Sequence, residues 1–167
     1  MKNTLVTFVT ALITFGFSAQ EITTEEQAFQ DSINALNTAS AATAESQEAY
    51  NLGIALFSKE KYKEAVAAFD RSITGDSKFE AAYYNKGVAQ YQMKTYKASL
   101  GTFTKLLGIN KEHGKAYFQR AQAHQKLNNL DAAIDDYDHA ILIDAKNYKA
   151  YYNAGGVNFL KKDYEKA

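Results

Sequence analysis

The chain has 167 residues, with 19 basic and 19 acidic side chains and no cysteine, proline or tryptophan. This even charge balance argues against nucleic-acid binding, which needs a contiguous basic surface. The lack of cysteine excludes a disulfide framework, a thiolate metal site and a cysteine nucleophile. Abundant Ala, Leu, Lys, Glu and Gln without proline favours a mostly α-helical chain.

Residues 1–19 have the shape of a secretory signal peptide. Lys2 precedes an uncharged, mostly apolar stretch from Leu5 to Phe17, which is short for a permanent membrane span of roughly 20 residues. Ser18 and Ala19 supply small residues for cleavage. We therefore expect export to the periplasm, the cell envelope or the medium, with no membrane span left after cleavage, and the style of the signal suggests a bacterial source. An uncleaved anchoring helix is the alternative.

Residues 20–45 form an acidic spacer. They carry five acidic side chains and no basic one, among many small polar residues. Ala28, Phe29, Ile33 and Leu36 fall at helical spacing, which predicts a short helix from Thr24 to Leu36. A flexible tether after the signal peptide is an equally good interpretation.

From Ser46 onward the sequence repeats with a period of 34 residues. Asn51-Leu52-Gly53 recurs as Asn85-Lys86-Gly87 and, two periods later, as Asn153-Ala154-Gly155. The same step relates Phe69, Phe103 and Tyr137. A period of this length indicates stacked copies of one supersecondary unit.

Each unit reads as two amphipathic helices joined by a polar turn. In the first unit these are residues 46–59, the turn Glu60-Lys61, and residues 62–74. Gly53, Gly87 and Gly155 lie inside predicted helices, where glycine costs about 1 kcal/mol relative to alanine. We interpret these glycines as sites where an aromatic ring of the second helix packs closely against the first.

A small residue in the first helix, an aromatic at the turn, and an alanine and an aromatic in the second helix together resemble the tetratricopeptide repeat. This resemblance implies an all-α, right-handed superhelical solenoid. It divides residues 46–167 into complete repeats at 46–79, 80–113 and 114–147 and a partial repeat at 148–167, comprising a first helix and its turn. Two departures stand out: Ser77, Lys111 and Ala145 replace the proline that often closes a repeat, and Leu106 occupies a slot that is usually small.

The partial repeat predicts an incomplete end to the array. Tyr151, Val157 and Phe159 are expected to lack the second helix that would cover them, and repeat arrays need a capped end to stay soluble. One interpretation is a truncated chain. The other is that the last helix is itself the cap, with Lys161, Lys162, Asp163 and Glu165 as its polar end.

No constellation of residues supports catalysis, a cofactor or a metal. The three histidines, His113, His124 and His139, occupy three different places in the repeat. The acidic run Asp135, Asp136 and Asp138 falls on a predicted helix, and we interpret it as a solvated face. The sequence predicts a protein that is not an enzyme.

The resemblance implies that the first helices of the repeats line a concave groove. An aromatic row and an amide row recur there, and a further row, Phe57, Tyr91, Gln125 and Phe159, is expected to widen the apolar strip. The aromatic row is Tyr50, Tyr84, Phe118 and Tyr152, and the amide row is Asn51, Asn85, Gln119 and Asn153. Rings supply apolar contact and amides can pair with an extended peptide backbone, although rings in these positions can also simply pack between helices.

We therefore predict a scaffold that binds a protein or peptide segment in this groove. A groove that clamps a terminal carboxylate with lysines is disfavoured, because rings occupy the slots that such a clamp needs. The alternatives are a structural repeat protein that self-associates through its C-terminal end, and the accessory repeat domain of a longer envelope protein.

Overall fold

The computed structural model describes residue 32 and residues 43–166, the last four of these by their backbone alone. The predicted signal peptide, and all of the predicted Thr24–Leu36 helix except Ser32, lie outside the described residues. The chain divides into two units, residues 1–43 and 44–167. The following paragraphs concern the second unit.

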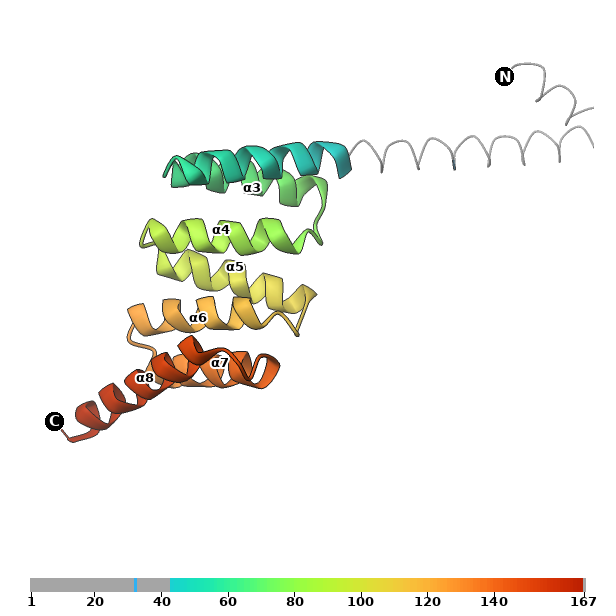
Figure 1. Ribbon diagram of the computed structural model, residues 1–167. Coiled ribbons are helices and arrows are strands. Elements are labelled where there is room, and N and C mark those ends of the chain that lie inside the picture. Colours follow the sequence, from blue (N-terminus) through green and yellow to red (C-terminus); the bar gives the residue numbers. More distant parts are fainter. Residues whose placement is uncertain (1–31, 33–42, 167) are drawn as a thin grey trace, which may run out of the picture. The chain divides into compact units, whose positions relative to one another are not determined.

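The described part of this unit consists of helices joined by short turns and contains no strand. Seven helices follow one another and stack as antiparallel hairpins (Figure 1). They cover residues 43–58, α3 (Tyr62–Gly75), α4 (Glu80–Gln92), α5 (Tyr96–Ile109), α6 (Gly114–Lys126), α7 (Leu130–Ile143) and α8 (Tyr148–Lys166). The predicted all-α helical solenoid is confirmed.

The turn inside each complete hairpin is the same left-handed motif. Glu60, Lys94 and Asn128 have φ values of 59°, 60° and 60°. The residue after each of them donates its N–H to the carbonyl five residues earlier. The N–H of Lys61 donates to the oxygen of Leu56 at 3.0 Å, and the equivalent bonds in the other two turns have the same length. This backbone pattern ends an α-helix and satisfies its last carbonyls.

The loops between hairpins also repeat, and they explain how the array dispenses with proline. Asp76, Asn110 and Asp144 stand one repeat apart, and a side-chain oxygen of each accepts the N–H two residues later, at 2.9, 2.9 and 3.0 Å. Such a side chain mimics a backbone turn and fixes the loop. The missing prolines are therefore replaced by a side-chain hydrogen bond.

Gly53 and Gly87 mark close packing within their hairpins, as predicted, whereas a Cβ on Gly155 would meet no atom within 4 Å, so the prediction was wrong for Gly155. A Cβ on Gly53 would lie 2.5 Å from the ring of Phe69, and a Cβ on Gly87 would lie 2.6 Å from the ring of Phe103. Leu106 is fully buried beside Phe103, so the core of the second hairpin closes in spite of its unusual residue.

Two expectations for the partial repeat were wrong. The predicted turn is absent, and α8 continues as a helix to Lys166; a left-handed turn is stabilised by the helix that packs after it, and none follows α8 in the described residues. Val157, expected to lack a partner, is fully buried in the cluster that also contains Tyr137 and Ala140 of α7. Tyr151 and Phe159 are 52% and 67% exposed, as expected.

Candidate peptide groove between α6 and α8

A pocket of about 490 Å³ lies between the first helices of the third and fourth units. Its walls come from α6 and α8 and combine three aromatic rings with three amides and a lysine. The lining residues are Phe118, Gln119, Gln122, Tyr148, Lys149, Tyr152 and Asn153. The structure thus brings together four residues of the two predicted rows.

A second pocket of about 300 Å³ continues from the first. It shares Gln122 and Asn153 with the larger pocket and reaches Tyr91 of α4. Its lining residues are Tyr91, Gln122, Gln125, Lys126, Asn128, Leu130, Asn153 and Leu160. The two pockets therefore form one groove, here called the C-terminal groove, that runs along α6.

The hydroxyl of Tyr137 forms part of the polar support of this groove. It donates to Oε1 of Gln125 at 3.2 Å. Burial raises the pKa of Tyr137 well above its usual value, the nearby phenol of Tyr91 raises it further, and a hydrogen bond with Asn153 opposes the shift. Tyr137 is accordingly a neutral phenol that positions two of the groove amides.

The predicted rings of the first two units pack against their own hairpins. The Tyr50 ring lies 5.9 Å from that of Phe69 and 4.9 Å from that of Phe79. Tyr84 lies 6.0 Å from Phe103 and stacks on a histidine ring at the next loop. These two rings line neither pocket and hold the hairpins together.

The Asn85 amide links neighbouring units. Its Nδ2 donates to the hydroxyl of Tyr50 and to the carbonyl of Ala81, both at 3.0 Å. Asn51, by contrast, is exposed, and its Oδ1 accepts from Gln47 at 3.0 Å. Neither amide belongs to the C-terminal groove.

The remaining predicted residues also make contacts within their hairpins. Phe57 meets Tyr62 edge-on at 5.2 Å, and Tyr91 meets Tyr96 in the same way at 5.2 Å. Burial, and then the neighbouring Tyr96, raise the pKa of Tyr91. Phe118 lies 5.7 Å from Tyr137 and still lines the larger pocket.

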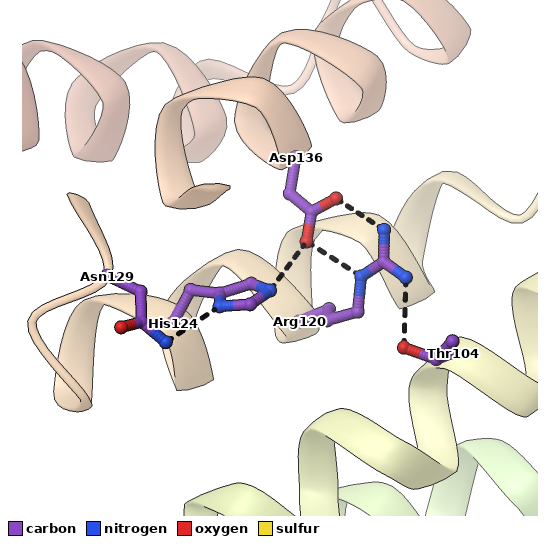
Figure 2. A network of polar contacts seen from close by, with 5 residues as sticks. All are labelled: Thr104, Arg120, His124, Asn129 and Asp136. Carbon is purple, nitrogen blue, oxygen red and sulfur yellow. Dashed lines mark hydrogen bonds and ion pairs between the residues drawn. The ribbon is translucent and has the colours of Figure 1, made fainter. Parts of the chain in front are cut away.

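Asp136 corrects the interpretation of the acidic run as a solvated face. Asp135 and Asp138 are exposed, but Asp136 is only 4% exposed and forms an ion pair with Arg120 through two hydrogen bonds of 2.8 and 2.7 Å (Figure 2). This contact raises the pKa of Arg120. The reason for the error is helical geometry, since the second of three acidic residues on an amphipathic helix can face inward.

Arg120 connects three helices through its guanidinium group. Besides Asp136 of α7, its Nη1 donates to Oγ1 of Thr104 on α5 at 3.1 Å. Nε2 of His124 lies 3.9 Å from the Asp136 carboxylate, and the Asn129 amide lies 3.4 Å from Nδ1 of His124 (Figure 2). Burial lowers the pKa of His124, the Asp136 carboxylate opposes this, and Arg120 adds to it. These contacts link α6 to α5 and α7.

Sequence reasoning missed seven lining residues: Gln122, Lys126, Asn128, Leu130, Tyr148, Lys149 and Leu160. The 34-residue register hides Gln122, because its equivalents are Ile54, Val88 and Gly156. Helical spacing could have found it, since Gln119, Gln122 and Lys126 stand at i, i+3 and i+7 on one face of α6.

Within the part of the chain that the structure describes, no group of three or more acidic or histidine side chains is placed to hold a metal ion. None of the described helices has the length and apolar character needed to cross a bilayer.

Two models of the tetratricopeptide repeat (TPR) match the chain, at residues 53–94 and at residues 114–147. These two stretches are therefore similar to tetratricopeptide repeats, as the sequence indicates. A comparison with curated protein sequences finds no match.

Solved TPR structures share the fold. The first TPR domain of human RPAP3 is 20% identical with a TM-score of 0.70, covering 74% of this chain and 97% of that domain. The first TPR of Spaghetti (RPAP3), solved with the HSP90 peptide SRMEEVD, is 19% identical with a TM-score of 0.70, covering 72% of this chain and 95% of that one. MamA from residue 41 to its end, from Desulfovibrio magneticus RS-1, is 25% identical with a TM-score of 0.67, covering 72% of this chain and 68% of that one.

Proposed function

We propose that this protein is an interaction scaffold, not an enzyme, and that it binds an extended segment of a partner protein in the C-terminal groove. The observation that carries the proposal is the pair of connected pockets along α6, lined by amides and rings from three first helices. Such a surface offers backbone pairing and apolar contact at the same time.

The amides determine the form of the ligand. Gln119, Gln122 and Asn153 each present a carbonyl acceptor and an NH₂ donor, and all three line the larger pocket. An extended peptide exposes donors and acceptors along its length, whereas a helix has already paired its own. The groove amides therefore favour an extended segment.

The rings and lysines indicate the side chains that the segment carries. Phe118 and Tyr152 line the larger pocket from opposite helices, so an apolar side chain can be held between them. Lys149 in one pocket and Lys126 in the other favour an acidic residue on the same segment, with an affinity that salt weakens.

The solved complex of Spaghetti (RPAP3) with the HSP90 peptide SRMEEVD supports peptide capture by this fold. The first units of the present chain differ from a lysine clamp for such a terminus. An aromatic ring, Tyr50, stands in the row that such a clamp would use, and the Tyr50 hydroxyl accepts a hydrogen bond from the Asn85 amide. We expect the present groove to prefer an internal segment over a carboxy-terminal one such as SRMEEVD.

The test is a selection of peptides from a random library on the immobilised protein, followed by fluorescence anisotropy of the selected peptides. Gln122→Ala and Asn153→Ala should each weaken binding about 5- to 20-fold, the loss expected for one or two hydrogen bonds. Asp138→Ala, which changes an exposed residue of α7 outside both pockets, should leave the affinity unchanged. Selected peptides that bind all three variants equally would contradict the proposal.

We further propose that the scaffold acts outside the cytoplasm, in the periplasm or envelope of a bacterium. The support is the charge and length pattern of residues 1–19. Amino-terminal sequencing of the protein isolated from its source cells should give Ala19 or Gln20 as the first residue. An intact Met1 would contradict export by cleavage.

A further inference from the structure

The third hairpin carries a tyrosine where the first two carry a phenylalanine. Tyr137 belongs to the repeat column whose other members are Phe69 and Phe103. All three rings are fully buried in their hairpins, so a phenylalanine at position 137 would meet the same packing requirement. A buried hydroxyl must also find hydrogen-bond partners to offset its lost contact with water. The hydroxyl of Tyr137 therefore needs an explanation other than packing.

Two amides of the smaller pocket share this hydroxyl. Tyr137 donates to Oε1 of Gln125 on α6 at 3.2 Å. The hydrogen bond with Asn153 of α8 opposes the rise in the pKa of Tyr137, and a hydrogen bond has this effect when it is donated to the phenolic oxygen. Asn153 is therefore the donor in that bond. Both amides line the smaller pocket, so one buried hydroxyl accepts from α8 and donates to α6.

These two bonds fix which atom each amide turns to the pocket. The oxygen and the NH₂ group of a carboxamide lie on separate branches. Gln125 uses its oxygen at Tyr137, which leaves Nε2 for the pocket, and Asn153 uses its NH₂ group, which leaves Oδ1. Among the described residues no buried side-chain nitrogen or oxygen lacks a partner, and no other bond of these two amides is found. The two remaining atoms therefore reach the pocket surface.

The tyrosine and the amide that it holds occur together at the groove. At the positions equivalent to Gln125 the first two hairpins carry rings, Phe57 and Tyr91. Those hairpins therefore have no amide at this place for a hydroxyl to orient. The third hairpin has both Gln125 and Tyr137, and its first helix lines both pockets. The pairing of the two residue types follows the groove and not the repeat.

We propose that Tyr137 sets the donor and acceptor order of the smaller pocket, so that one residue of an extended segment is held by its C=O at Gln125 and by its N–H at Asn153. This assignment rests on the proposed capture of a segment in the C-terminal groove. Both groups of one residue lie on the same side of an extended chain, so a single residue can meet both amides. Tyr137 is fully buried and lines neither pocket, and it acts as a positioning residue.

Backbone ester substitution tests this order. The probes are the tightest-binding peptide from the library selection and copies of it in which one amide N–H at a time is replaced by an ester oxygen. At the residue held by Asn153, the ester places an acceptor against Oδ1, and Asn153 cannot turn because Tyr137 holds its NH₂ group. That ester should bind the parent protein about 10-fold more weakly than the all-amide peptide.

Tyr137→Phe should reduce this ratio to about 2-fold, because Asn153 can then turn and donate to the ester oxygen. The ratio is taken within each variant, so a smaller fraction of folded protein weakens both peptides equally and cancels. Tyr84→Phe removes a hydroxyl that lies outside both pockets. It is the matched control and should keep the ratio of the parent protein. Circular dichroism of both variants checks that the helices are intact.

The outcomes separate this inference from the proposed function. A library that yields no binding peptide, or only peptides that Gln122→Ala and Asn153→Ala leave unaffected, contradicts the groove itself and this inference with it. Peptides that depend on Gln122 and Asn153 but have no ester position at which Tyr137→Phe lowers the ratio overturn only the role of Tyr137. An equal fall of the ratio in Tyr84→Phe overturns that role as well.

Discussion

At the scale of single residues, one repeat column shows that the packing around a glycine differs from hairpin to hairpin. The column consists of Gly53, Gly87, Ala121 and Gly155. Gly87 faces Phe103 at a distance that leaves no room for a methyl group, whereas Gly155 faces open space. The same residue type therefore has opposite energetic effects at equivalent places. Ala121, the third member of the column, is itself fully buried in the cluster that contains Tyr137.

Gly87→Ala should destabilise the protein by about 1 to 3 kcal/mol, because the strain of an added methyl group in a packed core exceeds the gain in helix propensity. Gly155→Ala should instead stabilise it by up to about 1 kcal/mol, the propensity difference alone. Urea unfolding of the two variants and the parent protein measures both changes. A loss of stability of similar size in the two variants would contradict the packing account.

Lys86 and Arg120 occupy one repeat position but have very different surroundings. Lys86 pairs with Asp70, whose side chain is half exposed, while Arg120 pairs with the buried Asp136. An exposed pair contributes at most about 1 kcal/mol. Removing one partner of a buried pair leaves a charge without compensation, at a cost of about 3 to 5 kcal/mol.

Arg120→Ala should therefore lower the free energy of unfolding by about 3 kcal/mol or more, and Lys86→Ala by less than about 1 kcal/mol. Chemical denaturation of the two variants under identical conditions makes the comparison. If the double variant Arg120→Ala with Asp136→Ala were no more stable than Arg120→Ala alone, the stranded Asp136 charge would not be the cause.

At the scale of helices and turns, the repeat pattern predicted nearly everything that is local. The hairpin boundaries at Glu60-Lys61 and the close approach at Gly53 follow from spacing, because a 34-residue register fixes which residues face each other. Asp136 was misread because helix periodicity alone does not say which of Asp135, Asp136 and Asp138 faces Arg120. The turn after α8 was wrongly predicted because a turn depends on the helix packed beyond it.

The candidate site was predicted in part, for a physical reason. Phe118, Gln119, Tyr152 and Asn153 recur with the repeat and line the C-terminal groove. Gln122 and Lys126 line it without recurring, since a groove binds one particular ligand and its chemistry need not follow the register. Tyr50 and Tyr84 recur because they support hairpins, so recurrence by itself does not separate packing from binding.

The link between α6 and α7 is expected to respond to pH through His124. Its pKa is lowered from 6.5, first by burial, with Asp136 opposing and Arg120 reinforcing the shift. The unfolded chain therefore binds a proton more readily than the folded one. The contribution of His124 to stability is complete above pH 6.5 and is lost as the pH falls through the folded pKa.

His124→Gln should remove this part of the pH dependence between pH 7.5 and 5.5. Glutamine suits the site, because Gln90 occupies the same repeat position and accepts from Thr102 at 2.7 Å. Urea unfolding of the variant should show a flatter stability profile than that of the parent protein. His139→Gln, at an exposed position of α7, serves as the control and should retain the parent slope.

At the scale of the whole array, stability is a sum of hairpins and of the contacts between neighbours. Units in the middle have a neighbour on both sides, while α8 has described helical packing on the α7 side only. Regions with few buried contacts open with the smallest free energies. The array should therefore unfold from its C-terminal end inward, and the groove wall formed by α8 is the part most easily opened.

Hydrogen exchange measured residue by residue should reveal this order. Amides of α5 and α6 should be the most protected, and those of α8 beyond Val157 should exchange first. The exchange rates of the two groups should differ roughly 100-fold or more if their free energies of opening differ by about 3 kcal/mol. A peptide bound in the C-terminal groove should slow exchange in α8 selectively, because it contacts that helix and stabilises its closed form. Uniform protection from α4 to α8 in the dilute, ligand-free protein would show instead that the array opens as one cooperative unit.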